Sequence, residues 1–333
     1  MDLTIIWAFL IAFAVLAYVV LDGFDLGTGI LFPLLGRHEN RDTAMNTVAP
    51  LWDGNETWLV LGGGGLFAVF PLAYAIIMPA LYAPIIVMLL ALIFRGVAFE
   101  FRFKTVRGRI LWDISFAFGS IMAALSQGIA LGTLVQGIKV ADRAYVGGWF
   151  DWLTPFSVMT GFAVVVGYAL LGATWLMMKT EGELHDIARR YAFITGIGTL
   201  VLIGAVSLWM PFLQPGFYGR WFDFPQIFAV APVPILVVVA AWSLFDSIAR
   251  EKHVRPFLSA LALFVLSFAG LGINFWPHII PPSVTIWDAA APESSQKFLL
   301  VGASVLIPLI LAYTAYAYWV FRGKVVEGEG YHH

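Results

Sequence analysis

Residues 4–34 read TIIWAFLIAFAVLAYVVLDGFDLGTGILFPL and contain only two charged side chains, Asp22 and Asp25. A helix needs about 20 mostly apolar residues to cross roughly 30 Å of hydrocarbon, so this stretch predicts a membrane-spanning helix. The preceding residues, Met1 to Thr4, carry no positive charge, and no small-residue cleavage site stands out after the apolar stretch. We therefore expect a retained helix and not a signal peptide.

The composition of the whole chain supports a membrane protein. Hydrophobic residues make up 60% of the sequence, charged residues 12%, and the mean hydropathy is +0.86. A soluble domain carries about a quarter charged residues, so most of this apolar surface must face lipid. The absence of cysteine excludes disulfides, zinc fingers, cysteine-ligated iron–sulfur clusters and thiol nucleophiles. The net charge of −2, without any basic run, gives no indication of nucleic-acid binding.

The chain is predicted to be an all-α polytopic membrane protein with about nine transmembrane helices. Residues 57–94 contain no charged residue and would be roughly 57 Å long as one helix, so the chain should reverse within them, near Pro71. The predicted spans are 4–34, 55–71, 75–97, 113–136, 154–178, 191–213, 226–246, 257–276 and 298–321.

The positions of Lys and Arg predict the orientation. With nine spans, fifteen of the nineteen Lys and Arg residues fall in segments on one side of the membrane and four on the other. Because cytoplasmic loops are enriched in Lys and Arg, the N-terminus is expected outside and the C-terminus in the cytoplasm. The expected location is therefore a membrane that borders the cytoplasm.

A faint internal repeat indicates two similar halves within one transmembrane domain, residues 1–333. The segments GRHENRDTAMN and GELHDIARRYA follow the first and fifth spans, and FRGVAFEFR and FDSIAREKH follow the third and seventh. Four spans separate the copies, so both would have the same orientation. We expect two four-helix bundles in a parallel repeat, residues 1–140 and 150–333, the second of which includes an additional ninth helix.

Asp22 and Asp25 are the residues least compatible with a lipid environment. They lie three residues apart and therefore on one face of a helix, and each ionised carboxylate at the bilayer centre costs about 2.5–3.5 kcal/mol. They must face protein or water, or one of them must be protonated. One interpretation is a neutral pair that caps helix backbone; the other is a pair of acidic stations for a proton or cation. The adjacent Gly23 and Gly27 are small residues of the kind that lets helices pack closely.

A second group of polar residues, WDGNETW at 52–58, precedes the second span. Asp53 and Asn55 could cap the start of that helix, since both side chains accept backbone N–H bonds. By the predicted topology this segment lies at the cytoplasmic end. A chain of acids leading from the cytoplasm into the membrane is then geometrically possible. Glu100 could join it from the end of the third span, although the pattern favours a solvated helix end there. The candidate proton-pathway residues are Asp22, Asp25, Asp53, Glu56 and Glu100.

Histidine is missing from the middle of every predicted span; the six histidines are His38, His185, His253, His278, His332 and His333. Buried haem needs axial ligands such as His, Met, Cys or Tyr. Met and Tyr remain available, but because no histidine lies within a span we predict that this chain carries no haem. Histidines and carboxylates with metal-ligand spacing are also missing, and we predict no metal site.

The motifs together resemble subunit II of cytochrome bd-type ubiquinol oxidases. The segments that carry the resemblance are LDGFDLGTG (21–29), APLWDGNETWL (49–59), GGGGLFAVFP (62–71), FRGVAFEFR (94–102), GELH (182–185), TIWDAAAPESS (285–295) and LIPLILAYTAYAYWVF (306–321). The pairing of DGFDxG with WDGNxxW is specific, and the resemblance runs from end to end. The length, without a long insert, is similar to that of the shorter, cyanide-insensitive branch.

This resemblance implies a respiratory heterodimer that oxidises quinol, reduces dioxygen to water and takes protons from the cytoplasm. Haems b and d would lie in a partner, subunit I, which has a similar fold; subunit II lacks haem and holds a structural quinone in some members. A small single-helix accessory subunit is a further candidate partner. Asp25 and Asp53 match acidic positions that the family associates with a proton route at the subunit interface, and Asp22 matches the first acid of that motif.

Two other functions fit part of the pattern. An ion-coupled transporter also has carboxylates within the membrane and glycine-interrupted helices. A purely structural scaffold subunit of an oxidase would need the acids for assembly but not for turnover.

Overall fold

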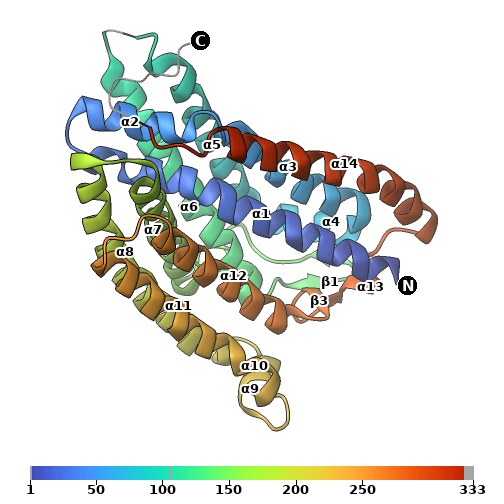
Figure 1. The fold of residues 1–333 in the computed structure, drawn as a ribbon. Helices are drawn as coiled ribbons and strands as arrows, with labels where there is room; N and C mark the ends of the chain where they lie inside the picture. The colour runs from blue at the N-terminus through green and yellow to red at the C-terminus, as the bar shows by residue number, and fades with distance from the viewer. Residues whose placement is uncertain (1, 106, 326–333) are drawn as a thin grey trace.

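The computed structural model describes residues 2–105 and 107–325 and is almost entirely helical (Figure 1). Eight helical segments in this part of the chain are long and apolar enough to cross a membrane, which confirms the predicted all-α membrane architecture. They are α1 with a short 3-10 turn (Leu3–Leu34), α5 (Tyr82–Arg102), α6 (Arg109–Gln136), α7 (Pro155–Lys179), α8 with a second such turn (Gly182–Phe212), α11 (Pro232–Ala249), α12 (Arg255–Phe275) and α14 (Glu293–Val320).

The predicted second span, 55–71, corresponds to α3 (Trp52–Val69), which falls outside these eight because its first turns are polar. The count of nine spans therefore stays a prediction. The reversal after α3 is distributed over the short α4 (Pro71–Ala80), which begins at the predicted Pro71. The Trp52 ring stacks on Phe99 with 4.9 Å between ring centroids, so the start of α3 lies beside the end of α5.

The remaining elements are short and lie at the ends of the long helices. They are α2 (His38–Val48), α9 (Pro215–Phe222), α10 (Ile227–Val230) and α13 (Ile286–Ala289). Two small antiparallel hairpins pair β1 (Val140–Ala141) with β2 (Ala144–Tyr145) and β3 (His278–Ile280) with β4 (Val284–Thr285). In Figure 1 β1, β3 and α13 lie toward the end that holds the N-terminus, and α2 lies at the opposite end.

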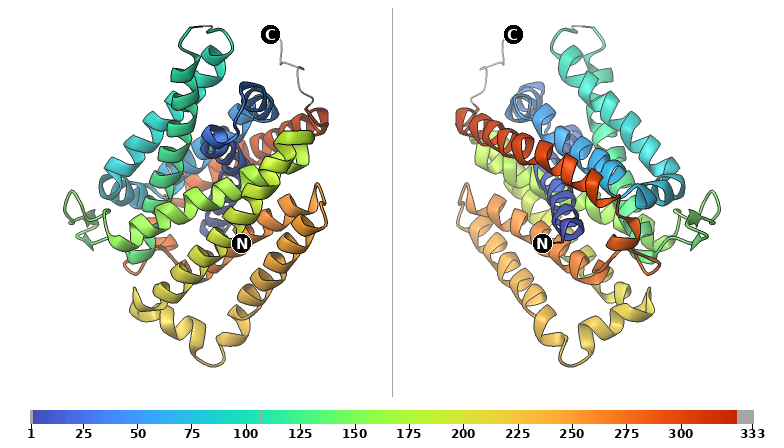
Figure 2. Two further views of the ribbon diagram at one scale, coloured as in Figure 1. Left: turned by 90° about the vertical axis from the view of Figure 1, so that its left-hand side faces the viewer. Right: turned by 90° about the vertical axis from the view of Figure 1, so that its right-hand side faces the viewer.

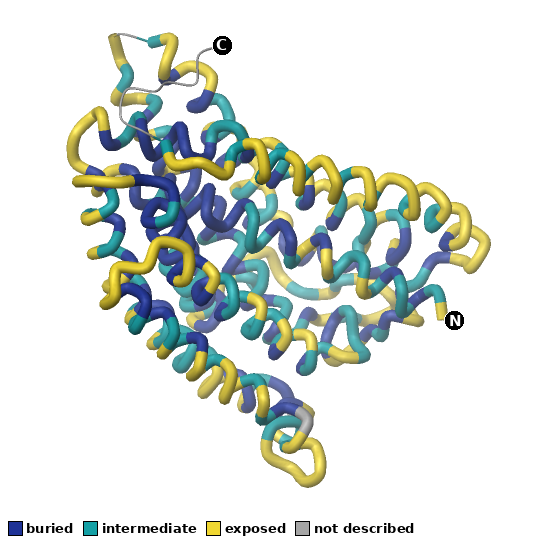
Figure 3. Tube along the Cα trace, in the orientation of Figure 1, coloured by how far each residue is buried: buried dark blue, intermediate teal, exposed yellow. Residues whose placement is uncertain are grey.

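Helix α1 occupies the centre of the molecule and packs on α3, α6 and α7 (Figures 1 and 2). Helices α5 and α6 form one antiparallel pair beside it, and α11 and α12 form another that packs against α7 and α8. Figure 3 shows the buried residues concentrated around α1 and its neighbours, whereas α14 runs along the outside. Phe298 and Val301 of α14 are 80% and 70% exposed, which suits contact with lipid or with another subunit.

Glycine allows α1 and α7 to approach at backbone distance. A Cβ atom on Gly27 would lie 1.8 Å from the carbonyl oxygen of Tyr168, and one on Gly172 would lie 2.2 Å from the carbonyl carbon of Gly27. One turn away, the Phe24 and Trp175 rings stack with centroids 4.1 Å apart. Small residues at a helix crossing are the usual means of close packing in membranes. Gly27 therefore has the packing role that the sequence indicated.

The Gly27 contact yields a direct test. Gly27→Ala places a methyl group against a backbone oxygen, so α1 and α7 must separate, and we expect a stability loss of about 1–3 kcal/mol or more. Gly63→Ala in α3 is the control, because a Cβ there meets nothing within 4 Å. Thermal unfolding midpoints of the two purified variants provide the comparison. Equal midpoints would show that the close approach is not required.

Candidate functional site

The two aspartates of α1 lie in the protein interior. Asp22 and Asp25 are both 0% exposed, and α1 continues without interruption through them to Leu31. As predicted from their spacing, they share one face of the helix, which is turned toward α3 and α5. Their charge therefore has to be balanced by those neighbouring helices.

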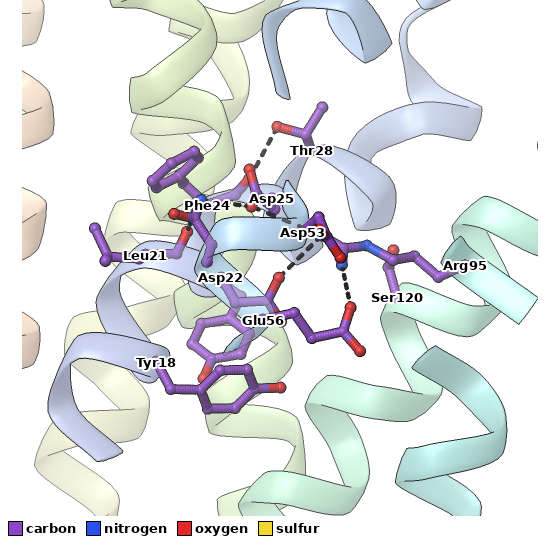
Figure 4. Close-up of polar contacts among 12 residues, drawn as sticks. Tyr18, Leu21, Asp22, Phe24, Asp25, Thr28, Asp53, Glu56, Arg95 and Ser120 are labelled. Carbon is purple, nitrogen blue, oxygen red and sulfur yellow. Dashed lines mark hydrogen bonds and ion pairs between the residues drawn. The ribbon is translucent and has the colours of Figure 1, made fainter. Parts of the chain in front are cut away.

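Arg95 of α5 is the partner of both aspartates (Figure 4). Its Nη2 lies 2.9 Å from Asp22 Oδ1 and 3.8 Å from Asp25 Oδ2, and its Nη1 lies 3.2 Å from Glu56 Oε2 on α3. The guanidinium is fully buried and also lies over the Trp52 ring, 5.5 Å from its centroid. One cation thus joins acids from two other helices, and we call Asp22, Asp25, Glu56 and Arg95 the buried cluster.

Asn55 extends this cluster to the last helix of the chain. Its Nδ2 donates to Asp25 Oδ2 at 2.8 Å and to the Leu21 carbonyl oxygen at 3.3 Å, and its Oδ1 accepts from the Tyr318 hydroxyl at 2.9 Å. Asn55 is therefore not a helix cap, and neither is Asp53, because α3 begins after Leu51 without a side-chain cap. The capping interpretation of these two residues was wrong because the helix starts earlier than the sequence pattern indicated.

Some polar atoms of the buried cluster remain unpaired among the described residues. Asp22 Oδ2, Asp25 Oδ1 and Arg95 Nε have no hydrogen-bond partner there although they are buried. The Glu56 side chain is 25% exposed, so one edge of the cluster reaches the surface. A carboxyl group with a free oxygen can accept or release a proton without breaking its existing contacts, which is the chemistry that a proton relay requires.

A second polar chain lies beside the cluster, farther into α6 and α7. Gln127 donates to the Tyr18 hydroxyl at 2.7 Å, and the Tyr168 hydroxyl donates to Gln127 Oε1 at 2.7 Å. Tyr18 lies one turn before Asp22 on α1, and all three side chains are buried or partly buried. The polar interior therefore continues from the buried cluster toward α7.

The structure brings together three of the five predicted proton-pathway residues: Asp22, Asp25 and Glu56. Asp53 lies in the first turn of α3 and is exposed, and Glu100 is exposed and paired with Lys104 at 3.2 Å. Among the described residues, neither forms a hydrogen bond or an ion pair with the buried cluster, and the pathway role of all five stays a prediction.

The residue that sequence reasoning missed is Arg95. The charge count assigns Arg95 and Arg102 to the cytoplasmic side, although Arg95 falls within the predicted span 75–97. In the structure both lie within α5 and are 0% exposed. Without these two, thirteen Lys and Arg residues still fall on the same side, so the predicted orientation keeps its basis. A usable signal did exist, because buried carboxylates require a cation and Arg95 follows directly on an apolar run.

Within residues 2–105 and 107–325, no group of three or more His, Cys, Asp or Glu side chains is placed to hold a metal ion. His38 and His185 lie in the first turns of α2 and α8, away from the centre of any span. His332 and His333 lie outside the described residues. These features define a polytopic helical membrane protein in which the two aspartates of α1 meet Arg95 at a buried site between α1, α3 and α5.

Comparison with known proteins gives the family. The family model for cytochrome bd terminal oxidase subunit II matches residues 3–321. Cytochrome bd-I ubiquinol oxidase subunit 2 of Escherichia coli (strain K12) is 31% identical over 98% of this chain and 96% of that protein. Cytochrome bd ubiquinol oxidase subunit 2 of Bacillus subtilis (strain 168) is 29% identical, with 97% of each chain covered.

The chain therefore belongs to the cytochrome bd terminal oxidase subunit II family, as its motifs predicted, and is a multi-pass membrane subunit of an oxidase complex. The fold agrees with this assignment. A chain in the structure of the bd oxidase from Geobacillus thermodenitrificans superposes with a TM-score of 0.74 at 17% identity, over 96% of this chain and 99% of that chain.

Removing the Arg95 charge should destabilise the protein strongly. Arg95→Gln leaves three carboxyl groups without their cation, and breaking a buried ion pair in this way costs about 3–5 kcal/mol. Lys104→Gln is the control, because Lys104 lies just after the end of α5 and forms an exposed pair with Glu100 of that helix. Unfolding of each purified variant by increasing denaturing detergent gives the two midpoints, and coincident midpoints would contradict the pairing.

A double variant tests whether Asp22 is the main partner. Arg95→Gln with Asp22→Asn removes both charges of the 2.9 Å pair, so its stability loss should fall short of the summed single losses by about 0.5–3 kcal/mol. Strictly additive losses would show that the two residues stabilise the protein independently.

Proposed function

We propose that this chain is the haem-free subunit II of a quinol:dioxygen oxidoreductase in the bacterial cytoplasmic (inner) membrane. It would pair with a haem-bearing subunit I that holds haems b and d and oxidises quinol. The relatives from Escherichia coli and Bacillus subtilis are described as ubiquinol oxidase subunits, which supports this assignment. The cyanide-insensitive branch stays a prediction from chain length.

The role we propose for the buried cluster is to pass protons from the cytoplasm toward the partner subunit. Reduction of one dioxygen to two waters consumes four electrons and four protons. A reaction centre enclosed by protein needs a path for those protons, and carboxyl groups in relay are suited to provide one. In this proposal Asp53 and the partly exposed Glu56 receive protons, and Asp22 and Asp25 pass them inward.

The observation that carries this proposal is the charge imbalance of the buried cluster. Three carboxyl groups, of Asp22, Asp25 and Glu56, face the single guanidinium of Arg95. Burying an uncompensated charge costs several kcal/mol. Arg95 balances only one of the three carboxylates, so burial favours protonation among the others. Protons held between neighbouring carboxyl groups are shared and can be exchanged.

The scaffold alternative explains part of the same geometry. Arg95 and Asn55 connect α1, α3, α5 and α14, and such contacts hold helices together whether or not protons move. The two functions predict different effects when Asp25 is replaced by an uncharged residue of similar shape. A scaffold needs the hydrogen bonds of Asp25, whereas a relay needs its ability to titrate.

Asp25→Asn separates the two functions. Asparagine has nearly the shape of aspartate but does not titrate, so oxygen consumption per haem in the purified complex should fall by about 10²-fold, the low end for a positioned proton-transfer group. Asp186→Asn is the matched control, because Asp186 is exposed near the start of α8. The yield of intact complex is measured beside turnover. Wild-type turnover per haem with a collapsed yield would support the scaffold instead.

We also propose that the N-terminus lies outside and the C-terminus in the cytoplasm. The uneven distribution of Lys and Arg supports this orientation. A reporter enzyme that works only in the cytoplasm should be active when fused after Tyr331, which lies outside the described residues. The same reporter inserted in residues 139–150 should be inactive. The reverse result for either fusion would overturn the orientation.

A further inference from the structure

A second charged cluster lies where α2, α5 and α6 meet, and the proposed proton route does not use it. Arg102 Nε contacts Asp113 Oδ1 at 2.5 Å and Arg102 Nη1 contacts Asp42 Oδ1 at 2.7 Å. Arg41 Nη1 contacts Asp113 Oδ2 at 3.1 Å, and Arg109 pairs with Asp42. We call Arg41, Asp42, Arg102, Arg109 and Asp113 the interfacial cluster, because they lie at the ends of their helices.

The interfacial cluster has more positive than negative charge. Three guanidinium groups face two carboxylates, and Arg102 is fully buried. Arg41 Nε, Arg102 Nη2 and Arg109 Nε are buried and have no acceptor among the described residues. Both oxygens of Asp113 are already engaged, by Arg102 and Arg41. The Arg41 and Arg109 side chains are 17% and 29% exposed, so an anion can approach them from outside and meets an excess of positive charge there.

An apolar hollow of about 250 Å³ adjoins this cluster. Arg41 and Asp113 line it where α2 approaches α6, and Ile114, Ala117, Phe118 and Ile121 line it along the next two turns of α6. Ile114 and Phe118 are 57% and 62% exposed, so the hollow opens onto the apolar outer surface of the molecule. The lining of the hollow is almost wholly apolar, and Arg41, paired with Asp113, lies at one end of it.

We propose that this hollow binds an anionic phospholipid, with its phosphodiester at the Arg41 end and one acyl chain along α6. Basic pockets between transmembrane helices are suited to anionic headgroups, and Arg donors match phosphate oxygens in geometry. A free phosphate ion would leave the apolar side without an occupant. Phosphatidylcholine is less suitable, because its headgroup adds a positively charged ammonium group to a cluster that already has an excess of positive charge.

The test uses the intact complex, with its haem-bearing partner, exchanged into nanodiscs of phosphatidylcholine that contain phosphatidylglycerol. Native mass spectrometry then counts the lipids that stay bound after release. We expect the wild-type complex to retain phosphatidylglycerol over phosphatidylcholine and Arg41→Gln to reduce that preference about tenfold, the effect of losing one charge-assisted hydrogen bond. Arg37→Gln is the control, because Arg37 lies at the same end but is 74% exposed and paired with Glu183.

Ile114→Trp tests the apolar side without changing any charge. It fills the hollow, so retention of phosphatidylglycerol should be lost while the haem spectrum and oxygen consumption match wild type; this arm also holds if Arg41→Gln fails to assemble. Three results would overturn the proposal. These are equal retention of both lipids by wild type, retention by Ile114→Trp equal to wild type, or displacement of the lipid by millimolar inorganic phosphate alone.

Discussion

The pairing of Arg95 with Asp22 is the interaction on which the first half of the structure depends. An isolated charge at the bilayer centre costs about 2.5–3.5 kcal/mol on the insertion scale, and here four ionisable groups lie in one interior. They are tolerated because Arg95 pairs with each of the three carboxyl groups. Since Arg95 comes from α5, Asp22 from α1 and Glu56 from α3, the same charge balance also fixes how these three helices are placed.

The DGFDLG segment contacts two different helices, α5 and α7, because its acids and its glycines lie on opposite faces of α1. At 100° per residue, Asp22 and Asp25 point to one side of α1, and Gly23 and Gly27 point roughly opposite. The acidic side meets Arg95, and the glycine side lets α7 approach to backbone contact. Substitution on either face would therefore disturb a different helix pair, which explains why one short segment combines charge with the smallest residues.

The sequence alone was sufficient for the class of protein, most span positions and the two buried acids, because long apolar runs and charges within them are local patterns. It was not sufficient for Arg95 and Arg102. A count of Lys and Arg assigns each to one side of the membrane and does not show burial. Only the packing of the folded chain places Arg95 and Arg102 on the buried face of the last two turns of α5. Asn55 was missed for a related reason: its partners, Asp25 and Tyr318, lie 30 and 263 residues away. Contacts between distant residues leave no periodicity to read.

The order of the chain has a consequence for biogenesis. Asp22 leaves the ribosome 73 residues before its partner Arg95, and domains form progressively from the N-terminus during synthesis. Helix α1 must therefore enter the bilayer on the strength of its apolar residues, whose mean hydropathy over the best window is 2.6. Its acids have no Arg95 partner until α5 has been synthesised. Tyr318, near the end of the chain, can complete the network only after almost the whole subunit has been made.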